Sequence, residues 1–271
     1  MRKTLALTIA LTASAAFAEI KLPEASPNKV ITQEVGVSKV TIDYHRPAMK
    51  GRKIWGDLVP IDKVWRLGAN NATTIELSHA AKVNGFDVPA GKYALFAIPK
   101  GETWTMILSK KPEQWGSYAY KAEDDQLRFG AKVEAIAATE WFDIDTVPVS
   151  DKAVRVEISW DKVRVPFTIE FDTPALVWKQ IDEKLASPAA TWDEYLTAAR
   201  YAMSTNTRFE EGLQWVDEAM RRRESFWNYE LKGLMLHKLG RDEEAAPLMY
   251  QAAELAKGKA PQEYVDNVLR E

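Results

Sequence analysis

The segment from Arg46 to Arg66 concentrates side chains that can hold an anion. It contains six cations against two acids, although the whole chain has a formal net charge of −3. An arginine guanidinium binds a carboxylate or phosphate through two parallel N–H donors, and each charge-assisted hydrogen bond contributes about 1.5–3 kcal/mol. Glycines in and just after the segment allow the backbone to approach a ligand closely. The pattern therefore predicts an anion-binding surface. Its cations are Arg46, Lys50, Arg52, Lys53, Lys63 and Arg66.

The same arginines can instead hold a long loop in place by donating to backbone carbonyls or buried acids. Arg66 lies among the apolar residues 64–67, which favours that structural role. For Arg46 and Arg52, on either side of Gly51, both roles stay open. We therefore expect Arg46 and Arg52 to be stronger ligand candidates than Arg66, while the lysines are expected to be solvated.

Asn70 and two aromatic residues complete the candidate ligand-binding set. Asn70 follows Gly68 and precedes a predicted strand. Since asparagine tolerates a left-handed backbone, a turn role is expected and a ligand hydrogen bond is the alternative. Trp115 and Tyr118 flank Gly116 and Ser117. Exposed aromatic rings can stack on sugars, so a carbohydrate is a second ligand class. The alternative is that these rings cover the end of the β domain.

Other chemistries receive little support. The chain has no cysteine, which excludes thiol catalysis and cysteine-ligated metals. The three histidines, His45, His79 and His237, show no metal-binding spacing, although the first two with Asp43 or Glu76 would form a two-histidine carboxylate set. We expect no metal and no cofactor. No G-x-S-x-G elbow is present, and the mild acidity gives no support to nucleic-acid binding.

Three functions remain open from these residues. The favoured one is an exported module that binds an anionic or sugar-like ligand. The alternatives are a hydrolase or lyase that acts on an exported polymer, and a structural envelope protein without a small ligand. A carboxylate pair, or a carboxylate with His45, in one pocket would favour the enzyme. Whether there is catalysis is left open, with binding preferred.

The elements that position these residues change type near Thr173. Before it, short runs rich in Val, Ile, Tyr and Phe alternate with turn residues, which predicts an antiparallel β-sandwich or jelly roll. Asn84-Gly85 predicts a tight hairpin, and Lys92–Ile98 reads as a buried central strand. Val154–Trp160 and Val163–Phe171 are predicted to form a closing hairpin around Asp161-Lys162.

The residues after Thr173 have a helical composition and a weak internal repeat. Phe209–Met220 aligns with Asp242–Ala253 at an offset of 33 residues, with small residues where helices would cross. This pattern predicts a small all-α, tetratricopeptide-like tail, which we expect to contact a protein partner. Gly240 is expected to end a helix as its C-cap.

The N-terminus has the pattern of a secretory signal peptide. Arg2 and Lys3 precede an apolar run that ends in Ala16-Phe17-Ala18. This run is too short for a membrane span of about 20 residues. Cleavage before Glu19 would give a periplasmic or secreted protein without a transmembrane segment. The predicted divisions are a signal peptide (1–18), a β-sandwich domain (19–172) and a helical tail (173–271).

Several short motifs are linked along the first part of the chain: YHRP (44–47), KGR (50–52), WG (55–56), LVP (58–60), VWRLGAN (64–70), VNG (83–85), PAGKYALFAIP (89–99) and WGSYAY (115–120). Together they resemble one family of exported bacterial proteins that carry a domain of unknown function, followed in some members by a helical tail. The resemblance spans roughly Ser26–Phe171. It implies the fold and its boundaries, and supplies no catalytic residue. The chain departs from the family pattern at His45, where a small polar residue is more usual.

Overall fold

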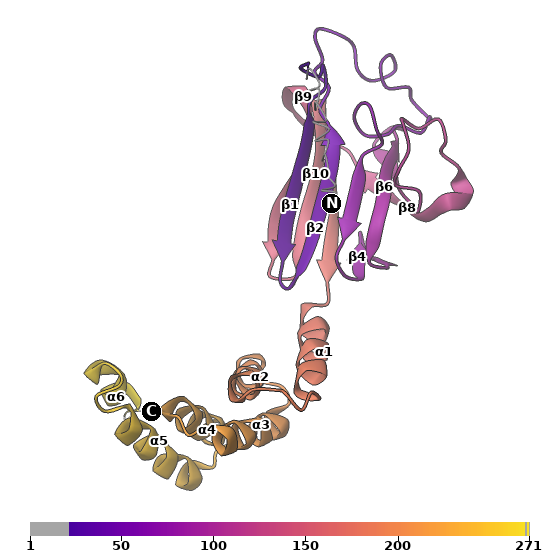
Figure 1. The fold of residues 1–271 in the computed structure, drawn as a ribbon. Helices are drawn as coiled ribbons and strands as arrows, with labels where there is room; N and C mark the ends of the chain where they lie inside the picture. The colour runs from indigo at the N-terminus through magenta and orange to yellow at the C-terminus, as the bar shows by residue number, and fades with distance from the viewer. Residues whose placement is uncertain (1–21, 269, 271) are drawn as a thin grey trace, which may run out of the picture. The chain divides into compact units, whose positions relative to one another are not determined.

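A computed structural model describes residues 22–268 and 270, so the predicted signal peptide lies outside the described residues. The chain divides into a β unit that ends at Phe171 and a helical unit that begins at Asp172 (Figure 1). The α+β class, with an antiparallel β part followed by helices, is therefore confirmed. None of the helices in the described part of the chain is both long and apolar enough to cross a membrane.

The β unit contains two antiparallel sheets. The six-stranded sheet and the four-stranded sheet have the strand orders β1-β2-β3-β6-β7-β8 and β5-β4-β10-β9. A short 3₁₀ helix, η1 (Ala122–Asp124), precedes β8. The strands are β1 (Asn28–Val35), β2 (Ser38–His45), β3 (Thr74–Leu77), β4 (Ala81–Val83), β5 (Phe86–Val88), β6 (Gly91–Ile98), β7 (Thr103–Ser109), β8 (Asp125–Lys132), β9 (Glu134–Ser150) and β10 (Ala153–Phe171).

Local sequence accounts for several of these strands. In β2, buried and less buried residues alternate, as expected for a strand with one face on the core. Residues 93–97 of β6 are buried on both faces, which confirms the predicted central strand. Asn84 and Gly85 both have positive φ, and they connect β4 to its antiparallel partner β5. The predicted Asn-Gly hairpin is therefore also confirmed.

The predicted closing hairpin at Asp161-Lys162 is wrong. Residues 153–171 form one long strand, β10, which runs antiparallel to β9 without reversing. Asp161 does have a positive φ of 51°, but the pairing continues from Ser159 with Asp143 to Val163 with Ala135. A single left-handed residue produces an irregularity in the ladder, whereas a type I′ hairpin needs two.

Four tryptophans form an aromatic cluster in the core of the β unit: Trp55, Trp65, Trp104 and Trp160. Trp65 and Trp160 stack with ring centroids 6.1 Å apart. Trp55 meets Trp65 edge-on at 5.8 Å and Trp104 at 4.9 Å. Two of these residues, Trp55 and Trp65, come from the cation-rich segment. The cluster therefore fixes that segment onto the strands that carry Trp104 and Trp160.

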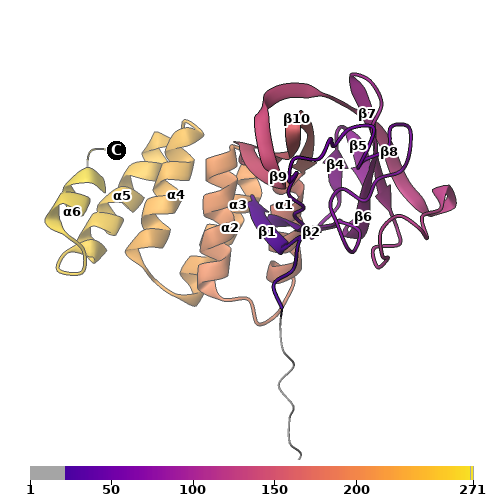
Figure 2. The ribbon, with the colours of Figure 1, turned by 90° about the horizontal axis from the view of Figure 1, so that it is seen from above.

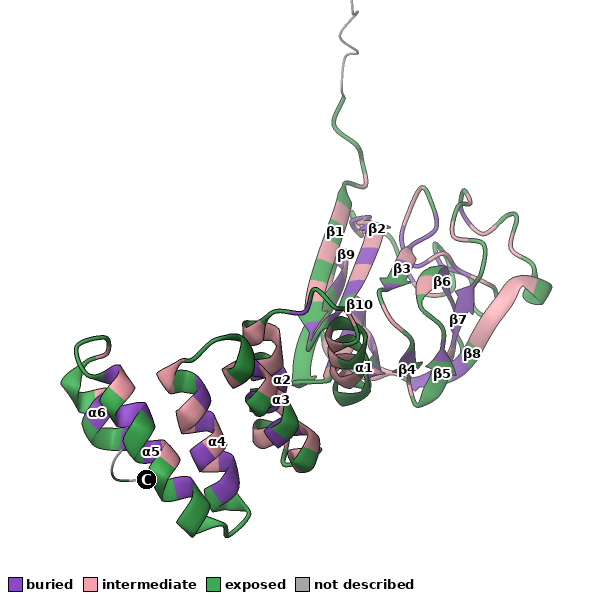
Figure 3. Ribbon diagram, turned by 60° about the horizontal axis from the view of Figure 1, so that its bottom comes forward, coloured by how far each residue is buried: buried purple, intermediate pink, exposed green. Residues whose placement is uncertain are grey.

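The helical unit consists of successive helices, of which α2–α3 and α4–α5 are packed as neighbours (Figure 2). Their buried residues gather on the sides that face other helices (Figure 3). A Cβ at Gly212 would lie 3.1 Å from Ala202 Cβ, so a small residue is needed at this crossing. The helices are α1 (Thr173–Leu185), α2 (Trp192–Thr205), α3 (Phe209–Arg222), α4 (Phe226–Lys238), α5 (Asp242–Ala256) and α6 (Gln262–Val268).

The end of α4 has the geometry expected for a glycine C-cap. Gly240 has a φ of 73°, and its N–H donates to the carbonyl of His237 at 2.8 Å. The N–H of Arg241 reaches back to the carbonyl of Leu236 at 3.0 Å. These bonds satisfy carbonyls at the end of α4, and the predicted role of Gly240 is confirmed.

Candidate functional site

A cavity of about 490 Å³ opens beside the cation-rich segment, and we call it the cationic cavity. Lys50, Arg52 and Arg66 line it together with the rings of Trp65 and Trp160. No acidic or histidine side chain of the described residues lines it. The cavity therefore combines positive charge with an aromatic wall taken from the tryptophan cluster.

Backbone pairing holds the part of this wall that carries Arg66. Trp65 exchanges two hydrogen bonds with Ala97 of β6, at 2.8 and 2.9 Å. The carbonyl of Arg66 accepts from the N–H of Thr73 at 3.2 Å, and the hydroxyl of Ser117 donates to the carbonyl of Val64 at 3.2 Å. The segment that carries Arg66 is thus hydrogen-bonded to Ala97, Thr73 and Ser117.

The chain immediately after Arg66 adopts an unusual backbone. Leu67, Gly68 and Asn70 all have positive φ, at 54°, 136° and 56°. A left-handed conformation costs a residue with a side chain about 1–2 kcal/mol, and Leu67 adopts it while fully buried. Gly68 has a steric reason as well, because a Cβ there would lie 2.6 Å from the carbonyl oxygen of His45. Such strain is concentrated at functional sites.

Arg66 is the least compensated cation in the cavity. Its Nε is buried and has no hydrogen-bond partner in the part of the chain that the structure describes. Burial lowers the pKa of the Arg66 guanidinium below its usual value, because the low-dielectric surroundings disfavour the charge, and nearby Tyr118 acts weakly in the opposite direction. The indole Nε1 of Trp55, in the adjoining cluster, is a second buried donor without a partner among the described residues.

Arg52 and Arg46, by contrast, are bonded within the protein. Arg52 donates from Nε to the carbonyl of Met49 at 2.9 Å and from Nη2 to that of Ala48 at 2.6 Å, although it still lines the cavity. Arg46 does not line it. Its Nε lies 3.2 Å from both the carbonyl of Phe142 and the carboxylate of Asp143. Of the three arginines, only Arg66 therefore has a buried side-chain donor without a partner among the described residues.

Asp143, which pairs with Arg46, is the centre of a hydrogen-bond network within the β unit. Asp143 also accepts from Lys29 Nζ at 2.9 Å and from the buried hydroxyl of Tyr44 at 2.5 Å. Burial and the hydrogen bond to Asp143 raise the pKa of Tyr44 well above its usual value. These side chains join β1, β2 and β9, so Arg46 contributes to sheet packing.

Asn70, Trp115 and Tyr118 do not line the cationic cavity, although each lies within two residues of one that does. Asn70 occupies the expected left-handed turn, and its carbonyl accepts from the N–H of Gly116 at 3.0 Å. Tyr118 is 86% exposed and Trp115 is 63% exposed. The sequence pattern placed these residues in one set, whereas the structure assigns Trp115 to a second, neighbouring cavity.

This second cavity of about 660 Å³ has a mixed polar lining, and we call it the polar cavity. Asp43, His45, Asn71 and Glu113 line it together with Trp115. From the sequence, His45 groups with Asp43 in a candidate two-histidine carboxylate set, but the sequence alone has no means of bringing Glu113 and Trp115 beside them. Only the fold shows this convergence.

The two histidines considered for a metal site lie apart. His79 Nδ1 contacts the hydroxyl of Ser38 at 3.1 Å, at the first residue of β2, while His45 is the last residue of that strand. Among the described residues, no group of three or more His, Asp or Glu side chains is arranged to hold a metal ion.

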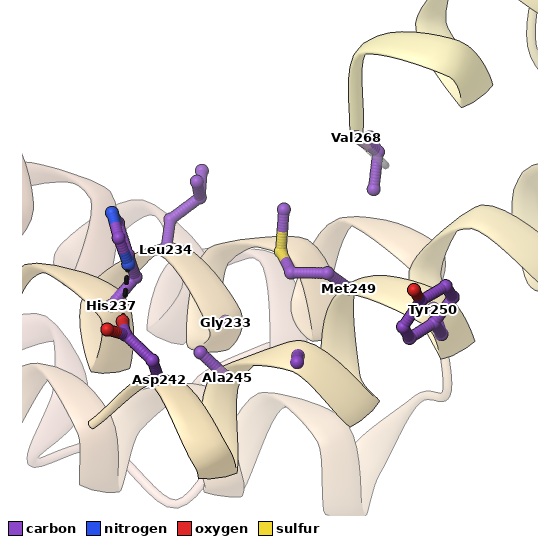
Figure 4. A pocket seen from close by; sticks show the side chains of 9 residues that line it. Gly233, Leu234, His237, Asp242, Ala245, Met249, Tyr250 and Val268 are labelled. Atoms are coloured by element: carbon purple, nitrogen blue, oxygen red, sulfur yellow. Dashed lines mark hydrogen bonds and ion pairs between the residues drawn. The ribbon is translucent and has the colours of Figure 1, made fainter. Parts of the chain in front are cut away.

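A further cavity of about 260 Å³ lies in the helical unit (Figure 4). Leu234, Met249 and Val268 give it an apolar lining. His237 Nδ1 and Asp242 Oδ1, 2.5 Å apart, form the polar pair in its wall. This cavity lacks the cations and paired aromatic rings of the cationic cavity, so it is a weaker candidate for an anionic ligand.

Comparison with known families gives one match. Residues 26–169 match the family described as "Protein of unknown function (DUF2911)", which agrees with the resemblance to a domain of unknown function. The helical unit lies outside the matched residues. Comparison with curated proteins and with solved structures gave no match.

The backbone around Arg66 predicts a difference between two glycines. Gly68 and Gly51 both have positive φ, but a Cβ at Gly51 would meet nothing within 4 Å. Gly51→Ala should therefore cost only the left-handed penalty of about 1–2 kcal/mol. Gly68→Ala should cost more, because the new methyl group would overlap a backbone oxygen. Urea unfolding of both variants measures the difference, and equal losses would contradict the geometry.

The hydrogen-bond pattern of the arginines predicts opposite effects on stability. Arg52→Ala should lower the free energy of unfolding by about 1.5–3 kcal/mol, since it removes charged hydrogen bonds to two carbonyls. Arg66→Met should leave stability unchanged or raise it, because it removes a half-buried charge without a partner. Thermal melts test both. A large loss of stability in Arg66→Met would show that Arg66 is mainly structural.

Proposed function

We propose that this chain, which belongs to the DUF2911 family of proteins of unknown function, binds an anionic ligand in the cationic cavity. One observation carries the proposal. Arg66 presents a buried Nε without a partner among the described residues, in a cavity shared with Lys50 and Arg52 and lined by no described acid.

The physical argument is that the protein bears a cost which an anion would remove. A half-buried guanidinium whose Nε has no partner among the described residues is unfavourable, and that Nε is a hydrogen-bond donor. A carboxylate or phosphate supplies acceptors and the opposite charge at once. The rings of Trp65 and Trp160 offer contact area for an apolar part of the same ligand.

Binding is preferred to catalysis in this cavity because its described lining has no general acid or base of the usual kinds. The lining cations hold an anion well, but no carboxylate or imidazole of the described residues stands beside them. The purely structural reading applies to Arg46, whose donors are used inside the protein. It does not account for Arg66.

One observation favours a hydrolase or lyase as the second candidate. The polar cavity is lined by two carboxylates and one histidine: Asp43, Glu113 and His45. Asp43 accepts from the side-chain amide of Asn28 at 2.5 Å, and His45 Nε2 lies 3.4 Å from a carboxylate oxygen of Glu24. A carboxylate and an imidazole in one cavity are side chains of the kinds that general acid–base catalysis uses.

The proposal also includes the cellular location of the protein and the role of its helical unit. The charged, apolar and small-residue pattern of residues 1–18 supports export to the periplasm or beyond, with cleavage before Glu19. The helical unit is proposed to contact a protein partner. Exposed aromatic side chains such as Trp227 and Tyr250 support that role.

Anion binding is tested with D-glucuronate and inorganic phosphate by isothermal titration calorimetry. We expect Arg66→Met to weaken binding of the better probe about 10- to 100-fold, as the loss of one charged hydrogen-bonding group implies. Lys63→Met is the matched control, because it also removes one positive charge, but from an exposed residue that does not line the cavity. Equal effects of the two variants, or no binding of either probe, would contradict the proposal.

The enzyme alternative is tested separately with p-nitrophenyl β-D-glucuronide. If the protein only binds its ligand, no nitrophenolate should be released on prolonged incubation. Release that disappears in Asp43→Asn and persists in Lys63→Met would favour the hydrolase instead, since only Asp43 belongs to the polar cavity.

A further inference from the structure

We infer that the ligand is an acidic oligosaccharide in which a uronate residue adjoins a neutral sugar. The uronate carboxylate would bind in the cationic cavity, and the neutral ring would stack on Trp115 in the polar cavity. This inference rests on the proposed function for its charged half. The neutral half rests on separate observations about Trp115 and its neighbours.

The two cavities are adjacent, because the same four chain segments line both. In each of the segments 26–28, 45–47, 69–71 and 115–117, one terminal residue lines the cationic cavity and the other lines the polar cavity. Two residues of chain span at most about 7 Å. One ligand of two sugar rings can therefore reach both cavities.

Each of these segments has one middle residue between the two that line the cavities, and we call these middle residues the ridge: Pro27, Arg46, Asn70 and Gly116. The N–H of Arg46 donates to the carbonyl of Pro27 at 2.9 Å, and the N–H of Gly116 donates to that of Asn70 at 3.0 Å. These main-chain N–H and carbonyl groups of the ridge are therefore already bonded to each other. Because they are not free to bind a ligand, side chains on the two sides of the ridge must recognise it.

Charge distinguishes the two sides of the ridge. The cationic cavity has three cations and no acid among its described lining residues. The polar cavity has two carboxylates, Asp43 and Glu113, together with Lys92 and His45. A second anionic group would meet two carboxylates there, so a ligand that is charged on every unit fits poorly. A ligand with one charged and one neutral end fits both sides.

The polar cavity also has the chemistry that recognises a hydroxylated ring. Trp115 is 63% exposed and offers an apolar face. Asn71 supplies an amide donor and acceptor, while Asp43 and Glu113 supply carboxylate acceptors for hydroxyl groups. The side-chain amide of Asn28 is already used, because it donates to Asp43 and to a backbone carbonyl. A sugar ring has an apolar C–H face and hydroxyl groups at its edge. The exposed indole can pack against the C–H face, and the surrounding carboxylates and the amide of Asn71 can bond to the hydroxyl groups.

The test compares three probes by titration calorimetry: D-glucuronate, cellobiose and cellobiouronic acid, the disaccharide of glucuronate and glucose. We expect cellobiouronic acid to bind about tenfold more tightly than glucuronate, because its glucose ring adds stacking and hydrogen bonds. Cellobiose should bind more weakly than either. Trp115→Ala should reduce the affinity for cellobiouronic acid to that for glucuronate, and Trp115→Phe should restore part of the gain.

Trp227→Ala is the matched control, since it removes a partly exposed tryptophan of the helical unit. It should leave all three affinities unchanged. Thermal melts of the Trp115 variants show whether they remain folded, and Trp115→Phe keeps the test valid if Trp115→Ala does not fold. Arg66→Met should weaken glucuronate and cellobiouronic acid by the same factor.

The outcomes separate this inference from the function on which it rests. Equal affinities for glucuronate and cellobiouronic acid, both dependent on Arg66, would overturn the neutral subsite and leave anion binding intact. A gain that survives in Trp115→Ala would likewise overturn it. If neither acid binds and phosphate fails as well, the proposed function itself is overturned.

Discussion

The aromatic cluster of Trp55, Trp65, Trp104 and Trp160 is the interaction on which the rest of the β unit depends. The cation-rich segment has few regular backbone partners, and its largest side chains pack against β7 and β10 through these rings. Buried aromatic side chains contribute more apolar area than any others. Because the cluster holds residues 55 and 65, the loop can carry charged residues and left-handed backbone between and after them without losing its position.

The stability that the cluster supplies permits local features that are unfavourable by themselves. Leu67 adopts a left-handed backbone, and Arg66 holds a half-buried charge that no described residue pairs. In a fold selected only for stability, a methionine or leucine at position 66 would serve better. Arg52, fourteen residues earlier in the chain, is bonded within the protein, with two backbone acceptors. The contrast between these arginines is the main support for the proposed binding function.

Much of the β unit can be predicted from its sequence, because the information is local. Alternation in β2, the apolar run in β6 and the Asn84-Gly85 turn depend on neighbouring residues only. Asp161 shows the limit of local reasoning. Its left-handed backbone is real, yet the long pairing of β10 with β9 continues past it, and a sequence pattern does not contain that pairing.

The site was less predictable because its chemistry depends on which groups are already satisfied. The sequence identified Arg46, Arg52 and Arg66 as cations of one segment, but the partners of Arg46, Phe142 and Asp143, lie almost a hundred residues further along the chain. Only the fold shows that Arg46 is committed to the sheets and Arg66 is not.

The same holds for the neighbouring polar cavity, where β2 meets the loop that carries Glu113 and Trp115. Under the proposal above, the unpartnered donor of Arg66 in one cavity selects the charged end of a ligand, and the carboxylates with the exposed indole in the other select the neutral ring beside it. That selectivity depends on the closeness of the two cavities, which follows from the short chain segments that they share.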